Sequence, residues 1–261
     1  MTDPARRSGI FPFAAGILFL GASLVPAWAT AAARAEEVRA AVAANFNLAA
    51  RDIGAAFEKA TGQKASFSFG STGQLFAQIT QAAPHEVFLA ADRERPRKAV
   101  EEGYAVPGTR FTYAVGRLAL YSREPGLQLG KATLRNRSFD RIAIANPTTA
   151  PYGAAAVQAM RALGVYEHLA PRLVQGINIG QAYQFIATGN AEFGFVALSQ
   201  IGNGLVGSHW VVPTDLHAAI AQDAVLLNRG VGNAAARAFM AFLRGPEARA
   251  IKETYGYGAG E

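Results

Sequence analysis

The chain has 261 residues, of which 51% are hydrophobic and 17% are charged. This composition is too apolar and too weakly charged for a disordered chain, and it can bury one large core or two moderate ones. The formal net charge of +6 is spread along the sequence without a basic face interleaved with aromatic residues, which argues against nucleic-acid binding. Because the chain contains no cysteine, disulfides, thiolate metal sites and cysteine nucleophiles are all excluded.

The first 35 residues have the charged, apolar and small-residue order of a signal peptide. Arg6 and Arg7 precede an apolar run over residues 10–25, and small residues follow around Ala29 and Ala35. The run is interrupted by proline and glycine, and it is shorter than the ~20 apolar residues that a membrane-spanning helix needs. We therefore predict that residues 1–35 are a signal peptide, and that the mature protein is soluble and periplasmic after export by the general secretory route.

The mature chain alternates short apolar strands with helices. Strands are predicted at residues 38–44, 64–69, 87–90, 111–115, 118–121, 141–145, 192–197, 210–212 and 224–227. Helices are predicted at residues 48–57, 75–79, 96–102, 152–163, 181–188, 234–243 and 247–254. Such alternation is typical of parallel sheets covered on both faces, and about 225 residues exceed what one such sheet usually occupies. The pattern therefore predicts an α/β fold with two lobes.

Two strand-to-helix turns carry short, neutral side chains that can form hydrogen bonds. They are Asn45-Phe46-Asn47 and Gly70-Ser71-Thr72-Gly73. A helix start exposes backbone N–H groups and the positive end of the helix dipole, so an anion can bind there without a cationic side chain. Asn45 and Thr72 could also be ordinary N-caps, since Asn, Ser and Thr are common capping residues. The presence of two such turns favours an anion site between them.

Other chemistries have weaker support in the sequence. The glycines around Ser71 lack the spacing and the lysine of a P-loop, and no dinucleotide-binding glycine triplet follows the first strand. An exported hydrolase that uses Ser71 as its nucleophile stays an alternative, although no Gly-x-Ser-x-Gly elbow occurs in the chain. Neither a metal site nor a cofactor is expected, because no two histidines lie at helical ligand spacing among His85, His168, His209 and His217.

Several segments, in order along nearly the whole mature chain, carry a family resemblance. They are Ala41–Phe46, Phe69–Gly73, Ala83–Asp92, Gly108–Gly116, Asn146-Pro147 with Ala150–Gly153, Gly194–Gln200 and Lys252–Gly256. Together they resemble the periplasmic molybdate-binding proteins of ABC importers, within the type II solute-binding superfamily. The resemblance implies two α/β lobes with mixed sheets of mainly parallel type, helices on both faces and a ligand cleft between the lobes. It places lobe 1 at residues 36–113 plus 226–261, and lobe 2 at residues 114–225.

The resemblance also implies a ligand and the residues that bind it. In such proteins neutral donors hold the oxyanion, which here implies side-chain and backbone donors of Asn45 and Thr72 from the first lobe. The matching donors of the second lobe are the backbone N–H groups of Tyr152 and Ile179. We expect a monomer without enzymatic activity that captures molybdate, and tungstate of nearly the same size, for the ABC permease in the inner membrane. Because such a site contains donors only, hydrogen phosphate is expected to bind less well than a fully ionised anion.

The sequence departs from the family pattern at two positions. Ala44 stands where many relatives have a Ser or Thr hydroxyl, and Ala197 stands where some have a tyrosine that contacts the anion. Loss of both hydroxyls could change the preferred anion, so a receptor for sulfate, phosphate or another oxyanion stays open as the first alternative. A sensory or scaffold role of the same fold is a further alternative.

Overall fold

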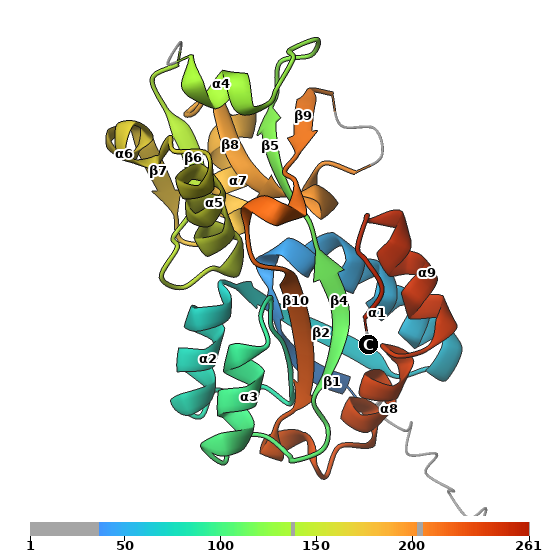
Figure 1. Ribbon diagram of the computed structural model, residues 1–261. Coiled ribbons are helices and arrows are strands. Elements are labelled where there is room, and N and C mark those ends of the chain that lie inside the picture. The colour runs from blue at the N-terminus through green and yellow to red at the C-terminus, as the bar shows by residue number, and fades with distance from the viewer. Residues whose placement is uncertain (1–36, 137–138, 203–205, 261) are drawn as a thin grey trace, which may run out of the picture. The chain divides into compact units, whose positions relative to one another are not determined.

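The computed structural model describes residues 37–136, 139–202 and 206–260. The predicted signal peptide, residues 1–35, lies outside the described residues. Two five-stranded sheets make up the described part, each with helices packed against it (Figure 1). We refer to each sheet with its helices as a lobe. In this part of the chain, no helix has both the length and the apolar character needed to cross a membrane.

The first lobe contains the sheet with the strand order β2-β1-β3-β10-β4. Its strands are β1 (Glu37–Ala43), β2 (Lys64–Gly70), β3 (Val87–Leu89), β4 (Phe111–Gly116) and β10 (Ile220–Leu226). β1 pairs in parallel with β2 and β3, whereas β10 runs antiparallel between β3 and β4. The helices are α1 (Asn47–Thr61), α2 (Thr72–Thr80), α3 (Glu94–Glu101), α8 (Ala234–Phe242) and α9 (Pro246–Thr254), with the 3-10 turns η1 (Ala44–Phe46) and η5 (Asn228–Gly230).

The second lobe contains the sheet with the strand order β7-β6-β8-β5-β9. Its strands are β5 (Leu118–Ser122), β6 (Ile142–Ala145), β7 (Leu173–Gly176), β8 (Phe193–Ala197) and β9 (Ser208–Val211). β6 is parallel to β7 and β8, and β5 is antiparallel to β8 and β9. The helices are α4 (Lys131–Arg135), α5 (Pro151–Ala162), α6 (Tyr166–Leu169) and α7 (Ile179–Ala187), with the 3-10 turns η2 (Ala170–Arg172), η3 (Leu198–Gln200) and η4 (Thr214–Leu216).

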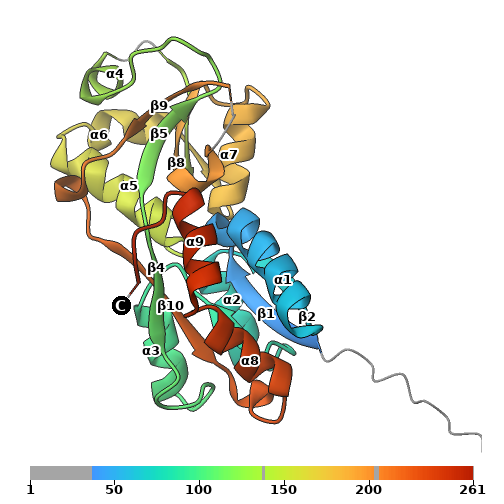
Figure 2. The same ribbon diagram turned by 90° about the vertical axis from the view of Figure 1, so that its right-hand side faces the viewer.

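The chain passes between the two sheets twice. The first passage is at Arg117, between β4 and β5, and the second lies between the end of β9 and the start of β10. Figure 2 shows β4 leading directly from the first sheet toward β5 of the second. The predicted lobe boundaries, after residues 113 and 225, fall inside β4 and β10. Any change in the angle between the lobes must therefore be absorbed at or beside these two strands.

Most predicted strands and helices are present within a few residues of their expected bounds, but three elements were not predicted. β7 has the sequence Leu-Val-Gln-Gly, which offers two apolar residues and no alternation, and it lies at the edge of its sheet. α4 and α6 have five and four residues, so an apolar repeat with helical period cannot develop within them.

The alternation of side chains along β1 divides the first lobe into two cores. Val38, Ala40 and Val42 face the core formed with α1, α8 and α9, while Ala41 faces the core formed with α2 and α3. Because all four are almost fully buried, β1 reads as a continuous apolar run, which is typical of a central parallel strand. The position of β1 fixes the turn that follows it, at the start of η1.

An aromatic cluster holds α1 and α8 against the first sheet. The ring of Phe239 lies edge-on to Phe57 with 5.3 Å between centroids, and 6.0 Å from the ring of Phe67. α1 approaches β2 closely because Gly54 has no side chain: a Cβ atom at this position would lie 2.8 Å from the Phe67 ring. The packing of the first lobe therefore depends on large rings beside one small residue.

We predict that Phe239→Ala strongly destabilises the first lobe. Phe239 is fully buried, so its truncation removes apolar burial and leaves a cavity between α1 and α8. A loss of about 3–5 kcal/mol in the free energy of unfolding is expected for such a change. Urea unfolding followed by circular dichroism measures it. Val231→Ala, at a site that is 51% exposed, is the control and should cost less than about 0.5 kcal/mol; equal losses in the two variants would contradict the prediction.

Candidate anion-binding site

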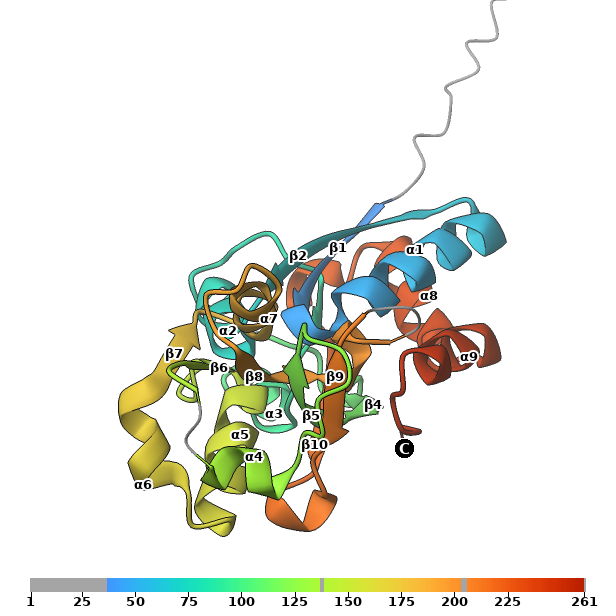
Figure 3. The ribbon, with the colours of Figure 1, turned by 90° about the horizontal axis from the view of Figure 1, so that it is seen from above.

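Four helical segments begin around one small cavity, two from each lobe. All four residues predicted from the sequence, Asn45, Thr72, Tyr152 and Ile179, line it. The other lining residues are Ala43, Ala44, Gly70, Ser71, Ala91, Ala150 and Pro151. Helix α7 of the second lobe lies beside η1 of the first, as the view from above shows (Figure 3). The fold thus brings together residues that are far apart in the sequence.

The cavity is small and its lining carries no ionised side chain. Its volume is about 10 Å³, which corresponds to roughly one water molecule by the same measure. Burial raises the pKa of Tyr152 well above its ordinary value, so its phenol stays neutral at physiological pH. Any negative charge of a ligand must therefore be balanced by N–H and O–H dipoles, as at the anion sites of other helix starts.

The start of α2 supplies donors from both backbone and side chain. Ser71, not Thr72, is the N-cap residue, and it forms a capping box with Gln74. Thr72 is the first helical residue, so its N–H has no partner within the helix. The Thr72 Oγ1 atom accepts a hydrogen bond from the Ala91 N–H at 3.0 Å, which leaves its own hydroxyl proton to be donated. Thr72 is only 1% exposed, and it offers two donors at the cavity wall.

The starts of α5 and α7 supply backbone donors from the second lobe. Pro151 occupies the first position of α5, so the N–H of Tyr152 is the first amide of this helix. Asn178 caps α7 by accepting the Gln181 N–H at 3.1 Å, which leaves Ile179 as the first helical residue. The N–H groups of Tyr152 and Ile179 have no partner in the described part of the chain. Both amides are free to donate to a ligand.

The side chain of Asn45 differs from the expected role of a side-chain donor. Its Nδ2 atom donates to Gln222 Oε1 at 2.9 Å and to Tyr257 Oη at 3.1 Å, so both amide protons are used within the protein. The backbone N–H of Asn45 lies in the first turn of η1, where an amide has no helical partner. Asn45 therefore offers its backbone, rather than its side chain, to the cavity.

The two departures from the family pattern lie in different environments. Ala44 lines the cavity and presents a methyl group to it. Ala197 is fully buried at the end of β8, does not line the cavity, and donates its N–H to Gln200 Oε1 at 2.9 Å. Three lining residues carry hydroxyl groups: Ser71, Thr72 and Tyr152. The Ser71 hydroxyl donates to Gln74 Oε1 at 2.9 Å and the Tyr152 hydroxyl accepts from Gln222 Nε2 at 3.2 Å.

A wider groove adjoins the cavity and links it to solvent. Its volume is about 440 Å³, and it shares Ala91, Ala150 and Pro151 with the cavity. Arg95 on its wall pairs with Asp92 at 2.5 Å, and its Nη2 donates to the carbonyl oxygen of Thr148 in the other lobe at 3.2 Å. A cationic group beside the entrance can attract an anion without binding it in the cavity.

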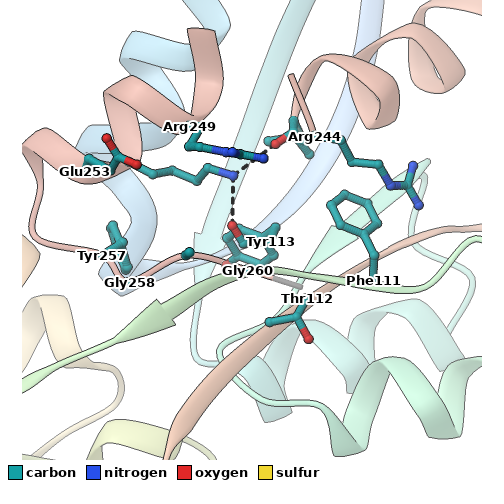
Figure 4. A pocket seen from close by; sticks show the side chains of 12 residues that line it. Phe111, Thr112, Tyr113, Arg244, Arg249, Glu253, Tyr257, Gly258 and Gly260 are labelled. Atoms are coloured by element: carbon teal, nitrogen blue, oxygen red, sulfur yellow. Dashed lines mark hydrogen bonds between the residues drawn. The ribbon is translucent and has the colours of Figure 1, made fainter. Parts of the chain in front are cut away.

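A separate pocket of about 180 Å³ lies on the first lobe and shares no lining residue with the cavity (Figure 4). The guanidinium of Arg244 lies over the Phe111 ring, 3.6 Å from its centroid. Lys252 is buried in the pocket wall, where its Nζ donates to the carbonyl oxygens of Tyr113 at 2.8 Å and Leu243 at 3.0 Å. Lys252 thereby joins α9 to β4 and to the end of α8, which is a structural role.

Comparison with known proteins identifies relatives over nearly the whole described chain. The family model of bacterial extracellular solute-binding proteins matches residues 38–258. The molybdate-binding protein ModA of Rhodobacter capsulatus is 55% identical over 225 residues, covering 86% of this chain and 89% of the relative. ModA of Azotobacter vinelandii is 51% identical over 246 residues, covering 93% of this chain and 96% of the relative.

Solved structures give the same result. The periplasmic molybdate-binding protein of Azotobacter vinelandii matches with a TM-score of 0.82 and 39% identity, over 85% of this chain and 98% of that one. The sulfate-binding protein SubI of Mycobacterium tuberculosis H37Rv has a TM-score of 0.71 at 11% identity, over 85% of this chain and 86% of that one, and shares the fold alone. The predicted resemblance and the predicted two-lobed α/β fold are confirmed. The relatives named here are binding proteins, which agrees with the prediction that the chain is not an enzyme.

We predict that Gly73→Ala weakens ligand binding without unfolding either lobe. The Gly73 N–H donates to the Thr149 carbonyl oxygen across the lobes at 2.9 Å, and a Cβ atom at residue 73 would lie 3.1 Å from the Thr149 Cα and Cβ atoms. The crowding exists only where the lobes touch, so alanine should obstruct closure. We expect about tenfold weaker binding, or about 1.4 kcal/mol, measured by calorimetry with oxyanions. Gly232→Ala, which meets no atom within 4 Å, is the control; unchanged affinity in Gly73→Ala would contradict the prediction.

We also predict a pH dependence of stability from Lys252. Burial, with repulsion from Arg249, lowers the pKa of Lys252 from 10.5 to about 8. Between these values the unfolded chain binds a proton that the folded chain does not, so the contribution of Lys252 to stability rises with pH and is least favourable below pH 8. Relative to Lys252→Met, the wild-type free energy of unfolding should rise by about 1 kcal/mol between pH 7 and pH 9.5, allowing for solvent screening. Lys131→Met, at an exposed site, is the control; a difference that stays constant with pH would refute the prediction.

Proposed function

We propose that this chain, which belongs to the family of bacterial extracellular solute-binding proteins, captures molybdate in the periplasm and delivers it to the permease of an ABC importer. The observation that carries the proposal is the convergence of four helix starts on a cavity without an ionised side chain. The names of the Rhodobacter and Azotobacter relatives, at 55% and 51% identity, support molybdate as the ligand. Tungstate, an oxyanion of nearly the same size, should bind in the same way.

The donor set matches a fully ionised tetrahedral oxyanion. We assign one donor to each of the backbone N–H groups of Asn45, Thr72, Tyr152 and Ile179, and one further donor to the Thr72 hydroxyl. Hydrogen bonds from fixed N–H groups to an anion are about twice as strong as neutral ones, so a dianion is held without a counter-charge. Hydrogen phosphate would direct its own proton at a site made of donors and leave that proton unpaired.

Binding on this proposal requires the two lobes to open and close. A cavity of about 10 Å³ lined by both lobes has room for roughly one water molecule, so the lobes must separate to admit a tetrahedral oxyanion. We propose that each sheet with its helices moves as one lobe, with bending at β4 and β10, the strands in which the predicted boundaries after residues 113 and 225 fall. Residues 1–35 would direct export, and the mature protein would act as a monomer.

Sulfate is the second candidate ligand, and the tightness of the cavity favours it. Sulfate is a smaller dianion than molybdate and needs the same kind of donors.

The hydrolase alternative is disfavoured by the surroundings of Ser71, whose hydroxyl donates to Gln74 Oε1 at 2.9 Å. A neutral amide oxygen cannot act as the general base that a serine nucleophile requires.

The proposal is tested by isothermal titration of the mature protein with molybdate, tungstate, sulfate and phosphate. We expect tight binding of molybdate and tungstate, and binding of phosphate weaker by at least about a hundredfold, or about 2.7 kcal/mol. Stronger binding of sulfate than of molybdate would reassign the ligand to the second candidate. The absence of binding for all four anions would refute the proposal.

We predict that Thr72→Ala weakens molybdate binding more than Thr72→Ser does. The alanine variant lacks the hydroxyl donor, and a hydrogen bond to a charged group is worth about 1.5–3 kcal/mol, which corresponds to roughly a tenfold to hundredfold loss of affinity. Serine keeps the hydroxyl that both donates to the ligand and accepts from the Ala91 N–H. The melting temperature of each ligand-free variant separates loss of binding from loss of fold. Equal affinity of the two variants would remove the Thr72 hydroxyl from the site.

A further inference from the structure

A buried group of polar side chains joins the two lobes behind the cavity. We call it the cross-lobe network; its members, all buried, are Asn45, Tyr113, Tyr152, Ser199, Gln222 and Tyr257. Gln222 of β10 is its centre: Oε1 accepts from Asn45 and from the Tyr113 hydroxyl at 3.0 Å, and Nε2 donates to the Tyr152 hydroxyl at 3.2 Å. The network therefore contacts both crossing strands and helix starts of both lobes.

Two hydroxyl groups converge on the carbonyl oxygen of Asn45. Ser199, in η3 of the second lobe, donates its hydroxyl to this oxygen at 2.9 Å. Tyr257, from the segment that follows α9 in the first lobe, donates to the same oxygen at 2.8 Å and lies 2.9 Å from Ser199 Oγ. The residue that offers its N–H to the cavity is thus held on its carbonyl side by one group from each lobe.

The hydroxyl of Tyr257 is fixed within the first lobe. The segment that carries it pairs with the crossing strand β4, since Gly258 N–H donates to the Val115 carbonyl at 2.8 Å and Val115 N–H donates back at 3.2 Å. The Tyr257 ring packs edge-on against Phe46 with 5.2 Å between centroids. Because Tyr257 belongs to the first lobe, its contact with Ser199 forms only when the second lobe lies against the first.

We infer that Ser199 and Tyr257 are positioning residues of the anion site, which fix the Asn45 turn and hold the lobes closed around the bound ligand. Neither residue lines the cavity, so both act through Asn45 rather than on the anion. The inference rests on the proposed function for its ligand, but the hydrogen bonds of Ser199 and Tyr257 are a property of the two lobes. Neither hydroxyl contacts the anion, so anion selectivity stays with the helix starts.

The inference predicts a change in ligand release rather than in ligand capture. Ser199→Ala removes the hydrogen bond from the second lobe to the Asn45 carbonyl oxygen, which exists only in the closed form. Tyr257→Phe removes the hydroxyl that contacts Ser199 Oγ across the lobes at 2.9 Å and donates to Asn45 within the first lobe. We expect the dissociation rate of molybdate to rise about tenfold in each variant, with the association rate unchanged within about twofold. The ratio of molybdate to sulfate affinity should stay constant. Stopped-flow fluorescence gives both rates, and competition calorimetry gives the ratio.

Two control variants remove hydroxyls of the same kinds whose contacts lie within the first lobe. Tyr255→Phe removes a hydroxyl two residues from Tyr257, but this hydroxyl donates to Asp52 Oδ2 at 2.6 Å within the first lobe. Ser66→Ala removes a serine hydroxyl that contacts the Val38 carbonyl at 3.4 Å, also within the first lobe. Both controls should release molybdate at the wild-type rate. In the double variant of Ser199 and Tyr257, the dissociation rate of molybdate should rise by less than the product of the two single increases, because the two hydroxyls share one acceptor.

A ligand-free measurement separates this inference from the proposed function. The chain has no cysteine, so cysteines introduced at the exposed positions Lys59 of α1 and Glu167 of α6 can carry spin labels whose distance distribution reports closure. We expect Ser199→Ala and Tyr257→Phe to shift this distribution toward larger distances than in the wild type, with and without molybdate. If the wild type binds no oxyanion, the proposed function fails, and the ligand-free distributions still decide the inference. Unchanged distributions, or unchanged release rates in a wild type that binds, overturn it.

Discussion

The structure depends on the satisfaction of backbone N–H groups at helix starts. The first amides of a helix have no partner within it, and burying such a group without a hydrogen bond costs about 1–3 kcal/mol. Here residues at the starts of η1, α2, α5 and α7 line one small cavity whose lining has no charged side chain. Both lobes contribute to this arrangement, so in the closed form its cost is relieved when an acceptor sits between them, whereas in an open form water pairs with the amides. A cleft built in this way favours an anion and, through it, the closed form.

Asn45 links the ligand cavity to the bending region of the molecule. Its backbone N–H belongs to the first turn of η1, its side-chain amide donates to Gln222 of the crossing strand β10, and its carbonyl accepts from both lobes. A buried polar network is favourable when every member is paired, and its geometry is then strict. The placement of one donor at the cavity is therefore coupled to the angle between the lobes by hydrogen bonds rather than by a flexible turn.

Local patterns in the sequence predicted the fold and singled out Asn45 and Thr72, whereas Tyr152 and Ile179 were predicted from the family resemblance; all four line the cavity. Turns such as Gly70–Gly73 after an apolar strand identify a helix start wherever they occur, and family resemblance then groups those starts into one site. The side-chain partners of Asn45 could not be predicted, since Gln222 and Tyr257 are 177 and 212 residues away in the chain. Ser199 was overlooked for the same reason: a serine after a strand has no local feature that indicates a contact with the opposite lobe.

Selectivity among dianions then becomes a question of closure rather than of donor chemistry. Molybdate, tungstate and sulfate all accept hydrogen bonds from the same amides, so the donor set cannot separate them by charge or protonation. Ala44 presents a methyl group to the cavity, where a hydroxyl could have rotated to suit anions of different size. A backbone amide at a helix start can move only with its helix, so it cannot adjust in this way. The distance between amides of opposite lobes is set by contacts at the helix starts, such as the hydrogen bond from the Gly73 N–H to the Thr149 carbonyl oxygen. An anion that is too small leaves amides unpaired, and one that is too large breaks these contacts. The contacts between the lobes, rather than the lining residues, therefore determine which anion size is accepted.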